Sequence, residues 1–260
     1  MESLLPERQF SQKWHIKGVL TVVLVILILF GSGQMTGVST DFSWDQFWQI
    51  LIKMTQPDWS YVSAIVTPIL ETIQMALVGT LLGTIIAVPF SLLAARNIMK
   101  NAVARGIIRF FLNLVRALPD LLLAALFVAI VGIGPMAGVG ALTVFSFGMI
   151  SKLFYEAIET IDDGPIEALT AAGANSIQTI VFAVVPQVFN QFLSYFLYTL
   201  EINVRASTVL GYLGAGGVGL YLSQTLSLFR YDRTAIVILA ILVVVIIVDG
   251  ISNRLREALA

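Results

Sequence analysis

Residues 167–186 have the sequence EALTAAGANSIQTIVFAVVP and lie between two long apolar runs. The first half is rich in alanine, which favours a helix with little steric bulk, and Gly173 is placed to end that helix. We interpret the stretch as a docking surface for a partner and not as a catalytic site.

The residues around this stretch predict two short helices joined by a turn. Asp162, Asp163, Gly164 and Pro165 precede it, and acidic residues and proline both favour the first turn of a helix. Asn175 or Ser176 is placed to cap a second helix that re-enters the apolar region at Pro186. The residues alone leave two readings open, because an ordinary pair of connecting helices would show the same pattern.

The composition indicates an all-α membrane protein. Of 260 residues, 58% are hydrophobic and 12% are charged, and the mean hydropathy is +0.90, which is far outside the range of soluble domains. A helix needs roughly 20 apolar residues to cross a bilayer. We expect about six transmembrane helices, near residues 18–30, 63–95, 118–133, 138–154, 186–210 and 235–248. The 18–30 run resembles a signal peptide, but no convincing cleavage site follows it.

The positions of Lys and Arg predict the orientation. Eleven of them fall on one side of the predicted spans and three, Lys53, Arg230 and Arg233, on the other, while Arg205 lies within a span. Because basic residues accumulate in cytoplasmic loops, the loop at 156–185 and both termini are expected in the cytoplasm. Residues 34–60 would then form an external segment with a short amphipathic helix.

The residue types and motifs that the sequence lacks exclude several functional classes. Cysteine is absent and His15 is the single histidine, so we expect no metal site built from such ligands. The sequence lacks G-x-S-x-G, H-E-x-x-H and the nucleotide-binding G-x-x-x-x-G-K-[ST]. No basic patch alternates with aromatic residues. We therefore expect no enzyme activity, no cofactor held by this chain and no nucleic-acid partner.

Two sets of residues within the apolar runs are candidates for function. Glu201 and Arg205 are four apart on one predicted helix, so they can pair in the membrane, where charged residues commonly mark a transport pathway. A partly neutralised arginine suits the passage of an anion, although a purely structural ion pair is the alternative. Asn203, Ser207 and Thr208 could add hydrogen bonds along the pathway, or Ser and Thr could bond only their own helix.

The second set is glycine-rich. It consists of Gly211, Gly214, Gly216, Gly217 and Gly219. These glycines allow a broken helix that could act as a gate, or alternatively tight helix packing.

The 167–186 stretch resembles the E-A-A-x3-G-x9-I-x-L-P signature of permease subunits of ABC importers. Glu167, Ala168, Gly173 and Pro186 match, whereas Leu169, Ala183 and Val185 depart from it. In that family the short helix is the coupling helix, which sits in a groove of the ATPase subunit. The resemblance therefore implies that these four residues couple the chain to an ATPase.

A second resemblance is to phosphonate-type permeases. Residues 201–219 (EINVRASTVLGYLGAGGVG) and 152–162 (KLFYEAIETID) are similar to theirs, and the likeness runs from about residue 60 to 250. It implies the type I ABC importer permease fold, with an N-terminal helix and amphipathic segment at 1–60 and a permease core at 61–260 that contains the coupling loop at 156–185.

That resemblance also implies a function and partners. The function would be inward transport of phosphonate, phosphate or phosphite by alternating access in the bacterial inner membrane. The partners would be ATPase subunits that bind the ATP, an extracytoplasmic substrate-binding protein, a second copy of the chain and membrane lipids. The alternative is a methionine or glycine betaine importer, whose substrates carry an ammonium group and should not favour a pathway arginine.

Overall fold

The computed structural model describes residues 18–26 and 43–259. The chain divides into two compact units, Met1–Trp48 and Gln49–Ala260. In the first unit, residues 18–26 are helical, and the rest of the span predicted at 18–30 lies outside the described residues. Helix α2 (Trp44–Met54) crosses the boundary and corresponds to the amphipathic helix expected in the external segment.

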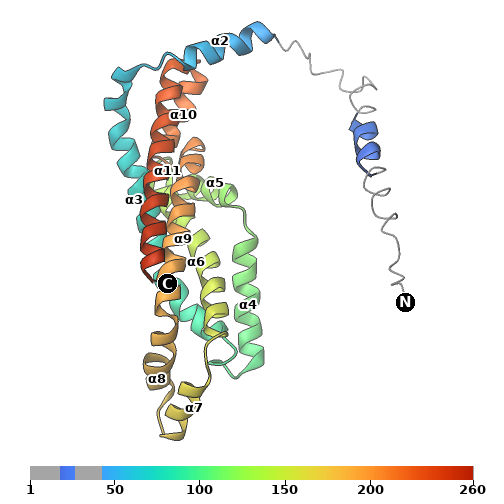
Figure 1. Ribbon diagram of the computed structural model, residues 1–260, viewed down its shortest axis with the longest axis vertical. Coiled ribbons are helices and arrows are strands. Elements are labelled where there is room, and N and C mark those ends of the chain that lie inside the picture. The colour runs from blue at the N-terminus through green and yellow to red at the C-terminus, as the bar shows by residue number, and fades with distance from the viewer. Residues whose placement is uncertain (1–17, 27–42, 260) are drawn as a thin grey trace, which may run out of the picture. The chain divides into compact units, whose positions relative to one another are not determined.

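The second unit is a bundle of helices (Figure 1). In chain order its elements are the 3-10 helix η1 (Trp59–Tyr61), α3 (Val62–Ala94), α4 (Ala102–Ala117), α5 (Asp120–Val131), α6 (Pro135–Ile158), α7 (Gly164–Ala171), α8 (Ser176–Thr179), the π-helix η2 (Ile180–Val184), α9 (Val185–Tyr212), α10 (Val218–Ser227) and α11 (Tyr231–Leu259).

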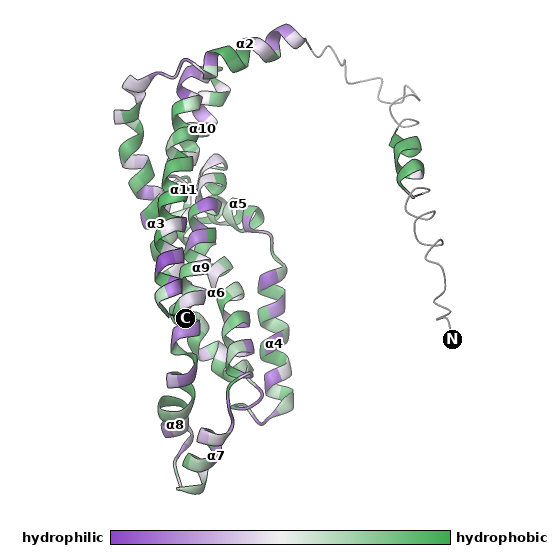
Figure 2. Ribbon diagram, viewed as in Figure 1, coloured by the Kyte–Doolittle hydropathy of each residue, from purple (hydrophilic) through white to green (hydrophobic). Residues whose placement is uncertain are grey.

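Four stretches of the described chain are long and apolar enough to cross a membrane. They are Trp59–Ala94, Pro135–Ile158, Ser176–Tyr212 and Tyr231–Leu259, and Figure 2 shows the apolar residues that dominate these helices. A fifth span results if α4 and α5, which meet at 85°, cross as one broken element. The spans predicted near 63–95, 138–154, 186–210 and 235–248 match α3, α6, α9 and α11.

The third predicted span is the one that differs. We expected a span over 118–133, but α5 has only 12 residues and is preceded by another helix, α4. The break follows from Pro119, because the residue before a proline is driven out of the helical region, and Leu118 has ψ 124°. The arginines of α4 lowered its mean hydropathy and concealed the apolar face that it carries.

That apolar face is continuous along α4. Val103, Ile107, Phe110 and Leu114 are all exposed and recur at helical spacing. Arg109 lies away from it and donates from Nε to the carbonyl of Ala94 at the end of α3 (2.9 Å). Arg109 therefore fastens the helix to the bundle.

Helices α3 and α6 pack closely against each other. A Cβ atom on Gly79 would lie 2.6 Å from Leu142 Cβ, and one on Gly83 would lie 2.5 Å from Ser146 Cβ. Contacts that short do not occur between real side chains, so glycine is required at both positions for the two backbones to approach.

The start of α11 is tied to the segment before α3. Arg233 Nε donates to Asp58 Oδ2 (3.2 Å), and Arg230 pairs with Asp232 (3.1 Å). A hydrogen bond from the Ser60 hydroxyl, aided by Arg233, lowers the pKa of Asp58 below its usual value. A lowered pKa means that the carboxylate stays charged at neutral pH and that the tie weakens only as the pH falls through the acid range.

Candidate functional site

The elbow, which we define as residues 162–187, projects at one end of the bundle (Figure 1). Its first helix, α7, has Pro165 in the first turn and contains no buried residue. Glu167, Ala168 and Gly173 are all exposed, and Ile166 is the residue of α7 that packs against the apolar core cluster that includes Ile158 and Val184. Helix α7 is therefore largely exposed on this chain.

The turn between α7 and α8 has a defined geometry. Gly173 has φ +84°, in the left-handed region, and the backbone N–H of Ala174 donates to the Leu169 carbonyl (2.9 Å). Asn175 then caps α8 in a reciprocal box: the N–H of Gln178 donates to Asn175 Oδ1 (2.9 Å), and the N–H of Asn175 donates to Gln178 Oε1 (2.8 Å). Of the two caps considered from sequence, the structure uses Asn175.

The base of the elbow is clamped to α9. The backbone N–H of Asp162 donates to Gln187 Oε1 (3.1 Å), and Gln187 Nε2 donates to the Asp162 carbonyl (3.3 Å). Pro186 lies beside this clamp at the start of α9 and is exposed. No local sequence pattern singles out Gln187, because its partner is 25 residues away.

The end of α6, which leads into the elbow, is also held in place. Glu159 accepts from the backbone N–H of Arg96 (2.7 Å) and forms an ion pair with Arg109, whose guanidinium lies 4.7 Å from the ring centre of Tyr155. The end of α6, the residues after α3 and the middle of α4 therefore meet at one carboxylate. This contact and the clamp on α9 both join the elbow to the bundle.

The predicted pairing of Glu201 with Arg205 is present on α9. Glu201 is 6% exposed, and it also accepts from Arg256 Nη2 of α11 (2.8 Å). The sequence pattern did not predict this second arginine, because the last span was expected to end at residue 248, whereas α11 continues to Leu259. The side chain of Arg205 is 54% exposed and that of Arg256 is 27% exposed.

The other candidate pathway residues do not join this charged cluster. Asn203 is fully buried, and its Nδ2 donates to Thr80 Oγ1 of α3 (2.7 Å) and to Ser146 Oγ of α6 (2.6 Å). The hydroxyls of Ser207 and Thr208 donate to backbone carbonyls three residues earlier. Asn203 therefore joins three helices, and the two hydroxyls bond within α9.

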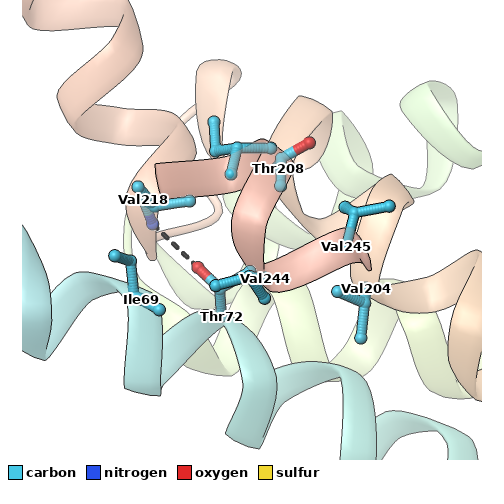
Figure 3. Close-up of a pocket in the computed structure, with 8 residues that line it drawn as sticks. Ile69, Thr72, Val204, Thr208, Val218, Val244 and Val245 are labelled. Carbon is cyan, nitrogen blue, oxygen red and sulfur yellow. Dashed lines mark hydrogen bonds between the residues drawn. The ribbon is translucent and has the colours of Figure 1, made fainter. Parts of the chain in front are cut away.

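The glycine-rich stretch breaks the helix between α9 and α10. Gly214, Gly216 and Gly217 have φ of +95°, +84° and +68°. The loop is hydrogen-bonded to two other parts of the bundle. The Gly134 N–H, just before α6, donates to the Gly214 carbonyl (2.9 Å), and the Val218 N–H donates to Thr72 Oγ1 of α3 (2.8 Å, Figure 3).

Gly211 and Gly219 are where the two sides of this break meet. A Cβ atom on Gly219 would overlap the carbonyl oxygen of Thr208, and one on Gly211 would overlap that of Gly216. Both glycines are buried, so the contact is between backbones with no space to spare.

The cavity in Figure 3 lies next to this loop and is too small for a substrate. Its volume is about 10 Å³, which is at the lower limit for a single water molecule. Its lining is almost entirely aliphatic.

These features define an integral membrane protein of several spans, with an exposed elbow at one end and a charged cluster between two of its spans. More particularly, the chain belongs to the family described as "Binding-protein-dependent transport system inner membrane component", whose signature matches residues 87–259. Members of this family are permease subunits and not enzymes.

Curated relatives agree with this membership. The chain is 40% identical over 201 residues to the phosphite transport system permease protein PtxC of Stutzerimonas stutzeri, covering 77% of this chain and 73% of the relative. It is 40% identical over 189 residues to the phosphate-import permease protein PhnE of Mycolicibacterium smegmatis, covering 73% of this chain and 36% of the relative.

Among solved structures, a chain of the inward-facing MetNI methionine ABC transporter matches with a TM-score of 0.69 at 24% identity. The match covers 78% of this chain and 99% of that one. The expected type I ABC importer permease fold and the resemblance to phosphonate-type permeases are both confirmed.

Proposed function

We propose that this chain is the permease subunit of an ABC importer that moves phosphite, phosphate or phosphonate into the cell by alternating access. The observation that carries the proposal is the 40% identity, over about three quarters of both chains, to a phosphite transport permease. The charged cluster supports it, because it places an exposed guanidinium on a membrane-spanning helix. Planar guanidinium groups bind phosphorus oxyanions through two parallel hydrogen bonds.

The proposed partners follow from the surfaces that the chain exposes. ATPase subunits dock on α7, and an extracytoplasmic binding protein delivers the substrate at the opposite end. Both termini are cytoplasmic. A second copy of the chain completes the pathway: Arg205 is more than half exposed on one chain, and arginines within spans face a protein interior or water instead of lipid.

Coupling in this proposal runs through the elbow. Closure of the ATPase subunits moves α7, and the Asp162–Gln187 clamp passes the movement to α9, which carries Glu201 and Arg205. The glycine-rich break at the far end of α9 is then the point at which the helix can gate the pathway.

A substitution at the elbow turn tests this coupling. Gly173→Val is expected to abolish uptake while ATP hydrolysis continues, because valine is strained at φ +84° by roughly 1–3 kcal/mol and distorts the turn. No atom lies within 4 Å of the added Cβ, so the effect would come from the backbone alone. The measurement is the ratio of substrate imported to ATP hydrolysed in proteoliposomes.

The matched control is Gly173→Asn, since asparagine tolerates the left-handed conformation. This variant should retain at least half of the wild-type ratio of substrate imported to ATP hydrolysed. Equal ratios for the valine variant and the wild type would contradict a coupling role for the elbow.

A competition assay tests the cargo. Uptake of labelled phosphite by the complete transporter should fall when unlabelled phosphate or methylphosphonate is added and should not change with methionine or glycine betaine. The chain shares its fold with the methionine transporter at 24% identity. A likeness at that level concerns the fold alone and does not indicate a shared substrate. Competition by methionine or betaine alone would favour the alternative importer.

A further inference from the structure

Glu201 is shared between two arginines that come from different helices. Its Oε1 accepts from Arg205, one turn further along α9, and its Oε2 accepts from Arg256, near the end of α11 (2.8 Å). One carboxylate and two guanidiniums leave the cluster with a net charge of +1. The cluster is thus not a closed ion pair, and it has the charge to hold a monoanion.

The two arginines are held to different degrees. Arg256 also donates to Asn253 Oδ1 (2.7 Å) and to the Ser252 carbonyl (3.4 Å), and its guanidinium lies 5.9 Å from the ring centre of Tyr198. The side chain of Arg205 is 54% exposed, against 27% for Arg256. Arg205 is therefore the arginine that can exchange its partner, and Arg256 is the fixed one.

The buried carboxylate makes the second arginine necessary. If Arg205 turned to an incoming anion and Glu201 had no other partner, a nearly buried negative charge would be left unpaired beside the anion. Unpaired charges in a low-dielectric site are strongly disfavoured, and the like charge would repel the ligand. Arg256 removes both penalties because it keeps Glu201 neutralised throughout the exchange.

We propose that Arg205, Glu201 and Arg256 form an anion-exchange site in which a tetrahedral phosphorus oxyanion replaces Glu201 at Arg205, while Arg256 retains Glu201. Arg205 binds the ligand, and Arg256 acts as a positioning residue. The inference rests on the proposed function for the identity of the anion. The shared carboxylate keeps the site from holding the anion too tightly, as a transport pathway requires.

The test uses the complete transporter in phosphatidylcholine nanodiscs, without ATP or binding protein. Phenylglyoxal, which modifies arginine, is applied over a series of phosphite concentrations, and modification of each arginine is followed by peptide mass spectrometry. Phosphite should slow the modification of Arg205 saturably by at least about fivefold. The exposed Arg254, on the same helix as Arg256, should show no protection and is the internal reference.

Variants separate the roles of the two partners. Arg256→Gln should raise the half-protecting phosphite concentration by about tenfold or more, corresponding to one charge-assisted contact. Glu201→Gln should lower the half-protecting phosphite concentration, because Arg205 then has no carboxylate partner to exchange for the anion. Arg254→Gln makes the same change in net charge as Arg256→Gln but outside the cluster. Its half-protecting phosphite concentration should stay within about twofold of the wild-type value.

Three results would overturn the inference: an unreactive or unprotected Arg205, a half-protecting concentration unchanged by Arg256→Gln, or protection by phosphatidylglycerol nanodiscs without phosphite, which would assign the site to lipid headgroups. Phosphite uptake is measured in parallel with the same purified wild-type transporter, reconstituted into proteoliposomes with ATP and binding protein. Uptake without protection refutes the exchange site alone, whereas protection without uptake refutes the proposed transport function and leaves the site.

Discussion

Gly219→Ala should prevent the bundle from assembling stably. We expect it to lower the free energy of unfolding by about 3 kcal/mol or more. The added methyl group would overlap the carbonyl oxygen of Thr208 and crowd Gly211, and both obstacles are backbone atoms that no rotamer change can move. Overpacking of a well-packed interior typically costs about 1–3 kcal/mol, and a rigid obstacle places this case at or above the top of that range.

The measurement is the melting temperature of the detergent-solubilised protein, followed by size-exclusion chromatography of heated samples. Gly106→Ala on α4 is the matched control, because no atom lies within 4 Å of its added Cβ and alanine favours a helix. A Gly219→Ala variant that melts within about 2 °C of this control would show that the two backbones do not make the contact described.

Glu201→Leu should destabilise the protein by about 2–3 kcal/mol and abolish uptake. The substitution leaves Arg256 and Arg205 as like charges with no shared carboxylate between α9 and α11. Removing one member of a fully buried pair costs about 3–5 kcal/mol, and the partial exposure of both arginines reduces that figure. The decisive readout is again the melting temperature, taken together with phosphite uptake.

A double variant distinguishes lost pairing from lost packing. Glu201→Leu/Arg256→Leu removes the charge conflict between the helices and should recover most of the stability without recovering uptake. If the single variant were as stable as the wild type, the carboxylate would not link the two helices. If the double variant transported phosphite normally, the cluster would have no part in the pathway.

The elements that could be predicted from sequence are those with a local signal. The turn at Gly173, the Asn175 cap and the spans of α3, α6, α9 and α11 are each encoded in residues close together in the chain. The spacing of four between Glu201 and Arg205 likewise predicted a pairing that the structure contains. Local patterns succeed here because helices satisfy their own backbone groups in a membrane.

The contacts that were missed join residues far apart in the chain. Arg256 reaches Glu201 across 55 residues, and Thr72 receives the Val218 N–H across 146. Helix α4 was missed for another reason, since three arginines on its polar side masked a continuous apolar face. The division at residue 60, the coupling role of Glu167 and its neighbours and the gating role of the glycines stay predictions.

ATP-driven uptake of labelled phosphite into proteoliposomes tests the central claim most directly. The vesicles contain this chain with its ATPase subunits, and binding protein and ATP are each omitted in turn. We expect accumulation only when all components are present. Accumulation that persists without ATP or without the binding protein, or an ATPase that responds to the binding protein while no phosphorus oxyanion enters, would contradict the account.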